Sequence, residues 1–496
     1  MPISVSFAYN KTMSYWLRHA AETVMREGLR VYRDQPETMP ELIERSATRR
    51  ATHRAVSELG GRGLTYEELW EESERVAAML QCRHEVEPGD RVAFLSANAL
   101  DLLIGVVAAW RAGGVAVTLS ARLTTFELEK QLSSCSPRVV LAQREWLSKV
   151  RQPAHELGQR SDDRFEPPRI GGSDPALLVF TSGTTGVSKG VVQSHRNLVS
   201  ATETWVRCLG LQQSDATVVA APMHHVTGLN GQSLPILAAG GSVAIMRRFD
   251  AVALADLLEA GAASFFHAAP TIYTLALRAA RSRHAAGLRV SVSGGSFVSR
   301  PLAADVRRFA PGVDFRISYG MTETSSPAVL TPPGWIDERP GDSVGVAVPV
   351  NDVRVDGEGE ILFRGSTVVT EREWLRSGDL GAIDDRGFVT VLDRIKDVIN
   401  RGGEKIASLE VEAVLLEHPG VVEAAVVGAQ DNVYGEVPKA FLVGDVRVEE
   451  LRAFAQLRLA RFKVPVEFIF VQQLPRNAGG KVLKAELRSE LVRPAR

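Results

Sequence analysis

Short apolar runs alternate with amphipathic segments through the first three quarters of the chain. Arg91–Leu95 and Val115–Thr118 have the composition of strands, while Ala99–Arg111 and Thr124–Ser133 have the spacing of helices. Strands separated by helices in this way are typical of parallel sheets with helices on their faces. We therefore expect an α/β fold in which parallel-rich sheets are covered by helices.

The same rhythm of strand and helix continues further along the chain. It returns at Ala216–Ala221, Gly241–Met246, Ala251–Gly261, Ala263–His267 and Leu288–Ser293. Open sheets of this kind bind ligands at the loops that leave the carboxyl ends of their strands. The loop after the predicted strand Leu177–Phe180 is such a place.

The pattern changes at about Gly345 to short strands with turn signals. Val353–Val355, Ile361–Phe363 and Gly387–Leu392 predict strands, and Asp356–Gly359 predicts a turn between the first two. We interpret this region as a small β subdomain that closes the large unit.

A different pattern follows Asp393–Lys396. It predicts, in order, a helix at Leu409–His418, strands at Val421–Val427 and Val437–Val443, a helix at Val448–Arg461 and a strand at Pro465–Val471. An α+β module of about a hundred residues is large enough to fold by itself. We therefore predict a large N-terminal domain at residues 1–395 and a small C-terminal domain at residues 396–496.

Composition narrows the class of protein. The 496 residues exceed one compact core, and 58 Lys and Arg residues against 59 Asp and Glu residues leave no global basic field for nucleic acid or anionic lipid. The longest apolar run, Leu102–Trp110, is far shorter than the ~20 residues of a membrane span. Cys82, Cys135 and Cys208 suggest neither a disulfide framework nor a metal site. We expect a cytoplasmic protein without a nucleic-acid partner or membrane span, and a single sequence leaves its oligomeric state open.

The segment Leu178–Gly190 places hydroxyls, glycines and one cation in a short turn after an apolar strand. Glycines let backbone N–H groups approach phosphate oxygens, while hydroxyls and a lysine add donors and a charge. A Walker A loop has glycine before its lysine and Ser or Thr after it, whereas Ser188 precedes Lys189 and Gly190 follows. We predict a different polyphosphate-binding loop, with contacts from Thr181, Ser182, Gly183, Thr184, Thr185, Gly186 and Lys189.

Two further segments suit a bound nucleotide. In Ser291–Ser296 a strand runs into glycines, so the backbone of Gly294, Gly295 and Ser296 could lie flat against a ring or sugar, although Gly-Gly after a strand is usually just a turn. The second segment is Ile317–Thr324. There we expect Ser318 and Gly320 near the nucleotide, Tyr319 to stack on a base, Thr322 to donate to phosphate and Glu323 to hold Mg²⁺.

Two charged residues lie in glycine-containing loops. Asp379, in Ser377–Gly381, is a candidate acceptor for the ribose hydroxyls, and Arg394 could fix the sugar or the α-phosphate. An aspartate after glycine is usually a plain turn residue, but this one is close to the predicted domain junction. Lys481 ends the loop Pro475–Lys481 after two glycines, which suggests a lysine delivered into a site.

His224 and His225 are adjacent but have no acidic or histidine partner at i+3 or i+4, which disfavours a metal site. We expect them in the wall of an acyl pocket, with His225 near the reacting carboxylate. The pocket candidates are His225, Gly228, Gln232, Val292, Gly294, Met321 and Ser326. Because these are mostly small or apolar, we expect an uncharged aryl or short-to-medium aliphatic acid.

Together these segments resemble the acyl- and aryl-CoA synthetases of the adenylate-forming superfamily, which also includes firefly luciferase and the adenylation domains of peptide synthetases. The resemblance covers nearly the whole chain and rests on five ordered motifs: TSGTTGVSKG, YGMTET, SGDLG, DRIKDVINRGGEKI and PRNAGGK. It implies an ATP-dependent acid–CoA ligase that needs Mg²⁺ and forms an acyl-adenylate.

The resemblance also implies roles for single residues. Lys481 matches the adenylation lysine, Asp379 the ribose ligand, Glu323 the Mg²⁺-linked glutamate and Lys396 the hinge. The loop that contains Gly402, Gly403 and Glu404 is expected to line the tunnel for the CoA thiol.

Three positions depart from the family pattern. Ser188 and Ser408 stand where proline is common, and Lys405 stands where asparagine is frequent. The GGEKI form also resembles aryl-acid enzymes that load carrier proteins, so transfer to an acyl carrier protein is an alternative to CoA. An α-amino acid substrate is disfavoured because no acidic residue lies beside His225. A luciferase-like oxidation and a non-enzymatic nucleotide sensor are further alternatives.

Overall fold

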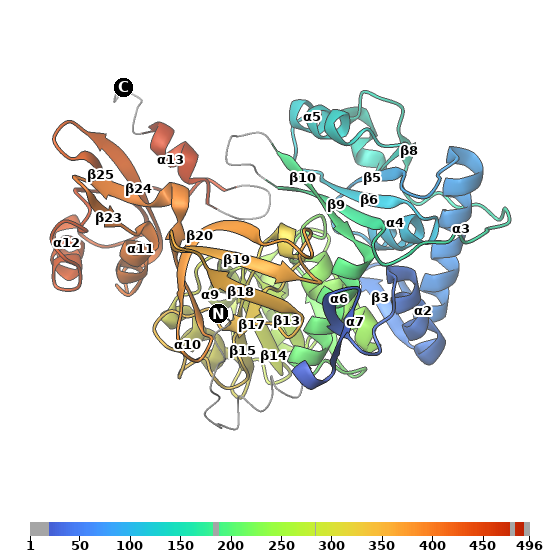
Figure 1. Cartoon of the computed structure of the whole chain (residues 1–496), viewed down its shortest axis with the longest axis horizontal. Coiled ribbons are helices and arrows are strands. Elements are labelled where there is room, and N and C mark those ends of the chain that lie inside the picture. Colours follow the sequence, from blue (N-terminus) through green and yellow to red (C-terminus); the bar gives the residue numbers. More distant parts are fainter. Residues whose placement is uncertain (1–18, 182–187, 283, 477–481, 491–496) are drawn as a thin grey trace.

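A computed structural model describes residues 19–181, 188–282, 284–476 and 482–490. It is a mixed α/β structure in which six sheets are packed with helices (Figure 1). This agrees with the fold class expected from the alternating pattern.

The first large sheet has the strand order β10-β9-β6-β5-β7-β8. Its strands are β5 (Arg91–Ser96), β6 (Val115–Ser120), β7 (Val139–Ala142), β8 (His155–Glu156), β9 (Pro175–Thr181) and β10 (Lys189–Ser194). All neighbours pair in parallel except β9 and β10, which form an antiparallel hairpin at the edge. The sheet therefore ends in the hairpin that contains the predicted phosphate-binding loop.

Two other sheets complete the core of the large unit. One has the order β11-β12-β3-β4 and contains β3 (Arg54–Glu58), β4 (Gly63–Thr65), β11 (Ala216–Val219) and β12 (Ser242–Ile245). The other has the order β13-β14-β15-β16-β17 and contains β13 (Phe265–Ala268), β14 (Val290–Gly294), β15 (Asp314–Tyr319), β16 (Val329–Leu330) and β17 (Val346–Ala347). A small hairpin, β1 (Thr23–Arg26) with β2 (Leu29–Tyr32), precedes them.

Helices cover these sheets. They are α2 (Met39–Arg50), α3 (Tyr66–His84), α4 (Leu100–Arg111), α5 (Thr125–Cys135), α6 (His195–Leu209), α7 (Leu234–Ala239), α8 (Ala251–Glu259), α9 (Pro270–Ala279) and α10 (Arg300–Phe309), with short turns η1 (Arg144–Lys149), η2 (Leu229–Ser233) and η3 (Thr322–Thr324). Helix α4 is buried on nearly every face, because it lies between a sheet and α3. That burial explains why its sequence forms the longest apolar run.

A four-stranded antiparallel sheet follows, formed by β18 (Asn351–Val355), β19 (Glu360–Gly365), β20 (Leu375–Ile383) and β21 (Val389–Arg394). Strand β20 contains the segment that we interpreted as a turn around Asp379, so that interpretation is wrong. The segment is extended because it pairs with β19 on one side and with β21 on the other. Gly381 is required there, since a β-carbon would overlap Ile361 and the Thr390 carbonyl.

The remaining unit has its own core, with Val411, Val426 and Leu451 among its fully buried residues. It consists of η4 (Ile395–Asp397), β22 (Ile399–Arg401), β23 (Glu404–Ile406), α11 (Ser408–Leu416), β24 (Val421–Asp431), β25 (Gly435–Gly444), α12 (Val448–Gln456), β26 (Glu467–Phe470) and α13 (Lys484–Glu490). Figure 1 shows this unit at the left, with α13 on the side that faces the rest of the molecule. The predicted helix at Val448–Arg461 is shorter than expected, because α12 ends at Gln456.

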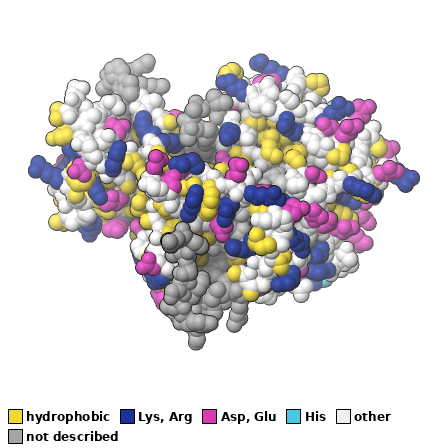
Figure 2. Space-filling view, viewed as in Figure 1, with side chains coloured by type: hydrophobic (Ala, Val, Ile, Leu, Met, Phe, Trp, Pro, Cys, Tyr) yellow, Lys and Arg dark blue, Asp and Glu magenta, His cyan; other side chains and the backbone are white. Residues whose placement is uncertain are grey.

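Basic and acidic side chains are intermixed on the face shown in Figure 2, as the balanced charge suggested. Among the described residues, no helix combines the length and apolar composition that crossing a membrane requires. The three cysteines are free, with Cys82 exposed and Cys135 and Cys208 buried.

Candidate functional site

The hairpin β9–β10 brings Thr181 and Lys189 opposite each other. The Thr181 hydroxyl donates to the Lys189 carbonyl at 3.4 Å, and the Lys189 side chain is exposed. Both residues therefore lie at the base of the predicted phosphate-binding loop. The other predicted contacts in that loop lie outside the described residues: Ser182, Gly183, Thr184, Thr185 and Gly186.

A buried polar network fixes this hairpin to the turn η3. Gln193 of β10 is fully buried, and its amide nitrogen donates to the Thr322 carbonyl at 2.6 Å. Its amide oxygen accepts from Asn230 Nδ2 at 3.0 Å. Sequence reasoning missed Gln193 and Asn230, although a glutamine at an inward-facing strand position is a signal of a buried polar contact. The network therefore fixes the position of Thr322, and of the half-buried Glu323 next to it, relative to the β9–β10 hairpin.

Strands β14 and β15 approach each other at Gly294 and Ser318, which are opposite in the parallel register. A β-carbon placed on Gly294 would overlap the hydroxyl and carbonyl oxygens of Ser318. The next residue, Gly295, has φ +80, a value that favours glycine, and open space around it. Glycine is therefore favoured at position 294 because the two strands approach closely there, and at position 295 because of its backbone conformation.

Substituting Gly294 with alanine should destabilise the protein by about 1–3 kcal/mol, because an extra carbon would force two paired strands apart. Thermal unfolding measures this loss, and ATP–pyrophosphate exchange should fall with it. The matched control is Gly295→Ala, which adds strain without an overlap. Equal thermal stability of the wild type and Gly294→Ala would contradict the close approach.

Tyr319 and Asp379 meet across two sheets. The Tyr319 hydroxyl donates to Asp379 Oδ2 at 2.7 Å, and Arg394 Nε lies 2.8 Å from Asp379 Oδ1. Burial and the neighbouring carboxylate raise the pKa of Tyr319 well above its usual value, so the hydroxyl remains a donor. Among the described residues, Asp379 Oδ1 is paired with Arg394 through this ion pair alone. It keeps acceptor capacity, as a ligand of hydroxyl groups needs.

The backbone around Asp379 is held by side chains. Ser377 Oγ accepts from the Asp379 amide at 3.0 Å, and Glu360 Oε1 accepts from the Gly378 amide at 2.8 Å. Gly378 has φ +74, which orients the chain just before the carboxylate. Asp379 is thus a preorganised residue with 4% of its surface exposed.

The candidate acyl-pocket residues come from several elements. His225 and Gly228 precede η2, Gln232 lies within it, Val292 and Gly294 lie on β14, and Met321 and Ser326 flank η3. His225 is half-buried, with Nδ1 at 3.3 Å from the Thr227 hydroxyl. The Gln232 amide nitrogen donates to the Thr217 hydroxyl and the Val218 carbonyl of β11, and its amide oxygen has no hydrogen-bond partner among the described residues.

His267, which sequence reasoning did not single out, is the penultimate residue of β13 and lies beside these residues. Its Nδ1 is 3.0 Å from the Gly231 carbonyl, and its ring is 4.9 Å from that of Trp205. Trp205 in turn donates to the Ser326 carbonyl at 3.0 Å. Burial lowers the pKa of His267 to about 4 and that of His224 to about 3, so both rings are neutral at pH 7. The sequence did offer a signal for His267, because it is the last residue of the predicted strand Ala263–His267 and ligands bind at such strand ends.

The predicted thiol-tunnel residues Gly402, Gly403 and Glu404 are exposed; the two glycines form the turn between β22 and β23, and Glu404 begins β23. The Gly402 amide donates to the Tyr434 carbonyl at 2.7 Å, and the Gly403 amide donates to Asn400 Oδ1 at 3.1 Å. The hinge candidate Lys396 lies in η4. The predicted nucleotide contact Ser296 follows β14 and is exposed. The adenylation-lysine candidate Lys481 lies outside the described residues.

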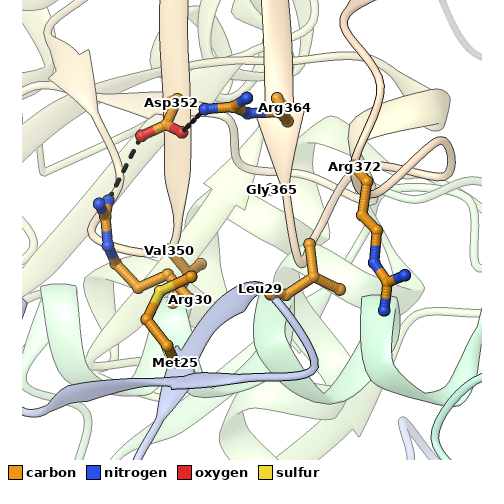
Figure 3. Close-up of a pocket in the computed structure, with 9 residues that line it drawn as sticks. Met25, Leu29, Arg30, Val350, Asp352, Arg364, Gly365 and Arg372 are labelled. Carbon is orange, nitrogen blue, oxygen red and sulfur yellow. Dashed lines mark hydrogen bonds and ion pairs between the residues drawn. The ribbon is translucent and has the colours of Figure 1, made fainter.

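A separate cavity of about 370 Å³ lies between the β1–β2 hairpin and strands β18 and β19 (Figure 3). Asp352 is bound there by Arg364 at 2.8 Å and approached by Arg30 at 3.4 Å. None of the predicted site residues lines it. No group of three or more His, Cys, Asp and Glu side chains suitable for a metal occurs in the part of the chain that the structure describes.

Comparison with known proteins shows the family to which this chain belongs. Residues 43–371 match the model of the AMP-binding enzyme family, and residues 410–481 match the AMP-binding enzyme C-terminal domain. Because the first match covers more than half of the chain, the chain belongs to the AMP-binding enzyme family.

Individual relatives narrow the class further. The chain is 34% identical to a feruloyl-CoA synthase from Amycolatopsis sp, over 89% of this chain and 96% of the relative. It is 32% identical to a 2-succinylbenzoate–CoA ligase from Bacillus licheniformis, over 86% of this chain and 95% of the relative. Structures of o-succinylbenzoate CoA synthetase from Bacillus subtilis with ATP and magnesium ion and with its acyl-adenylate superpose with TM-scores of 0.80, at 30% identity, and cover 91% of this chain and 99% of that one.

The protein is an AMP-forming acid–thiol ligase, an acyl-CoA synthetase that acts through an acyl-adenylate. It uses ATP, Mg²⁺ and CoA together with a small carboxylic acid. The resemblance drawn from the five sequence motifs is thereby confirmed.

Proposed function

We propose that the substrate is an uncharged aryl or short-to-medium aliphatic carboxylic acid. The observation that carries the proposal is the neutral wall around η2, where His267 lies beside the Trp205 ring and burial keeps both His224 and His267 uncharged. The candidate pocket residues include no Asp, Glu, Lys or Arg to pair with a second carboxylate or an ammonium group. Feruloyl and 2-succinylbenzoate, the acids in the names of the two relatives, both contain an aromatic ring; 2-succinylbenzoate also has a second carboxylate, so it supports the aryl part of the proposal alone.

A panel of acids in an ATP–pyrophosphate exchange assay tests the substrate class. Monocarboxylic aryl acids such as benzoate and cinnamate, and hexanoate among aliphatic acids, should support exchange. Aliphatic dicarboxylates and α-amino acids should be weaker by about 10²-fold or more, because burying a charge without a partner is costly. Preference for a dicarboxylate or an amino acid would contradict the neutral pocket, and no exchange with any acid would contradict adenylation itself.

We propose the following roles for the predicted site residues. The carboxylate must attack a negatively charged α-phosphate, and the thiol must then attack the acyl-adenylate carbonyl and expel AMP. We assign charge screening to Lys189 and Lys481, and donation to phosphate to Thr322. Glu323 would hold Mg²⁺, which supplies further screening of phosphate charge.

We assign nucleotide binding to the meeting point of β14, β15, β20 and β21. Asp379 would accept from the ribose hydroxyls, while Arg394 and Tyr319 hold that carboxylate in place. Tyr319 has an additional task that we did not predict, because its hydroxyl positions Asp379. The backbone of Gly294, Gly295, Ser296, Ser318 and Gly320 would surround the base and sugar.

We propose that residues 396–496 rotate as a unit against residues 1–395, with Lys396 as the pivot. The exposed turn at Gly402–Glu404 would replace the Lys481 loop when the thiol attacks. Carrier-protein phosphopantetheine is the alternative acceptor, and comparing free CoA with a loaded carrier distinguishes the two. Oxygen consumption would reveal a luciferase-like reaction. We also propose a cytoplasmic location, in keeping with three free cysteines.

A further inference from the structure

A buried cluster of charged and polar groups spans the proposed pivot. Asp393 is the penultimate residue of β21, three residues before Lys396, and its side chain reaches Ser408, the first residue of α11. Asp393 Oδ2 accepts from the Ser408 amide, and Asp393 Oδ1 accepts from the Arg394 amide at 2.7 Å. Asp393 and Ser408 are both almost completely buried.

The bond from Asp393 caps α11 from outside the small unit. The first amides of a helix have no partner within the helix, and they are usually satisfied by a side chain at the N-cap position. The N-cap residue of α11 is Ala407, which provides no such side chain. Asp393, fifteen residues earlier in the chain, provides the missing acceptor.

Lys484 of α13 closes the cluster from the other side. Its ammonium donates to Ser408 Oγ at 2.6 Å and lies 2.6 Å from Glu412 Oε1. Glu412 is also buried and accepts from the Val426 amide at 2.7 Å. Burial raises the pKa of both Asp393 and Glu412, while Lys484 acts in the opposite direction on each. Ser408 therefore links an aspartate before the pivot to a lysine after it.

Ser408 is one of the three positions at which this chain departs from the family pattern, which commonly has proline there. A proline has neither the amide hydrogen that Asp393 accepts nor the hydroxyl that accepts from Lys484. Both contacts depend on this departure.

We propose that Asp393, Ser408 and Lys484 form a lock that stabilises the orientation of the small domain in which acyl-adenylate is made. The proposal rests on the proposed rotation about Lys396. Asp393 lies before that pivot and Ser408 after it, so any rotation there moves one against the other. Hydrogen bonds weaken once donor and acceptor separate beyond about 3.2 Å, so the lock must open when the domain turns.

The contacts identify the stabilised orientation. Asp393 is adjacent to Arg394, which contacts the ribose candidate Asp379. The lock thus fixes the beginning of α13, three residues after Lys481 in the sequence, to the edge of the nucleotide site. In the same orientation the described contacts of Gly402 and Gly403 are with Tyr434 and Asn400 of their own unit. Both observations favour the adenylation orientation.

Ser408→Pro is the sharpest test, because it removes the amide hydrogen and the hydroxyl at the first helical position, where proline is tolerated. ATP–pyrophosphate exchange should fall roughly 10-fold, while thioester formation from supplied acyl-adenylate should be unchanged or faster, since the population shifts to the other orientation. Ser408→Ala, which keeps the amide, should give a smaller shift in the same direction.

Asp393→Asn tests the other partner with little change in shape. It should also lower exchange without slowing the thioester step, and the double variant with Ser408→Pro should be no worse than the more severe single one. The matched control is Lys463→Met, which breaks a pair with Glu410 on α11 that lies wholly within the small domain. Both half-reactions of this control should stay within about twofold of wild type. Parallel loss of both half-reactions in Ser408→Pro and Asp393→Asn, or multiplied effects in the double variant, would overturn the lock.

Amide hydrogen exchange gives a readout that needs no turnover. Asp393→Asn should speed exchange in the first turn of α11 relative to Lys463→Met, because the cap is weakened. Unaltered protection would also overturn the proposal, even in a protein with normal activity. Failure of the proposed function is distinguishable, because the wild type would then show no pyrophosphate exchange with any acid.

Discussion

Replacing Asp379 with alanine should lower ATP–pyrophosphate exchange roughly 10²- to 10⁴-fold. A hydrogen bond to a charged acceptor contributes about 1.5–3 kcal/mol, and the two ribose hydroxyls would lose two of them. The substitution would also release Arg394 and the Tyr319 hydroxyl from the carboxylate that holds them. Exchange assays at a series of ATP concentrations should show most of the loss as a raised KM for ATP together with a lower maximal rate.

Two controls separate nucleotide binding from general damage. Asp352→Asn removes an exposed aspartate that pairs with Arg364 in the same sheet, and it should leave exchange within about twofold of wild type. Tyr319→Phe keeps the ring but removes the hydroxyl that donates to Asp379, so it should give an intermediate loss. Normal exchange by Asp379→Ala that is folded by thermal unfolding would refute the ribose assignment.

The elements with the strongest hydrophobic pattern were predictable from sequence. Strand β5 and helix α4 differ from their predicted ranges by one residue at one end. Both are buried by contacts that favour their local pattern, so periodicity and tertiary structure agree. Strand β20 was not predictable, because its glycines and polar residues resemble a turn until β19 and β21 pair with it.

In the candidate site, too, some features were predictable from sequence and others were not. Its glycines and charged residues are visible in motifs because they are adjacent in sequence. The contact from Tyr319 to Asp379 spans sixty positions, and the network of Gln193 and Asn230 joins three separate elements. Such contacts depend on how the sheets pack, which a periodic pattern does not specify. Sequence therefore identified residues that would touch a ligand more readily than those that hold them in place.

Replacing Lys396 with proline should slow the thioester step about 10²-fold or more and leave pyrophosphate exchange within a few-fold of wild type. Lys396 lies in the short helix η4, whose backbone already uses φ values close to those that a proline ring imposes. No hydrogen bond from the Lys396 amide occurs among the described contacts, so the orientation seen here loses little. Rotation about that φ angle would be blocked, and the domain rotation that we propose for the second half-reaction depends on it.

The measurement compares exchange with CoA-thioester formation from supplied acyl-adenylate in the same preparation. Lys396→Ala is the control, because it removes the charge but not the torsional freedom, and both of its half-reactions should persist. Lys396→Pro and Ser408→Pro both introduce proline near the pivot, yet we expect opposite effects: the first holds the domain in the adenylation orientation and the second releases it. Equal rates of the thioester step in Lys396→Pro and Lys396→Ala would show that the domain does not turn at this residue.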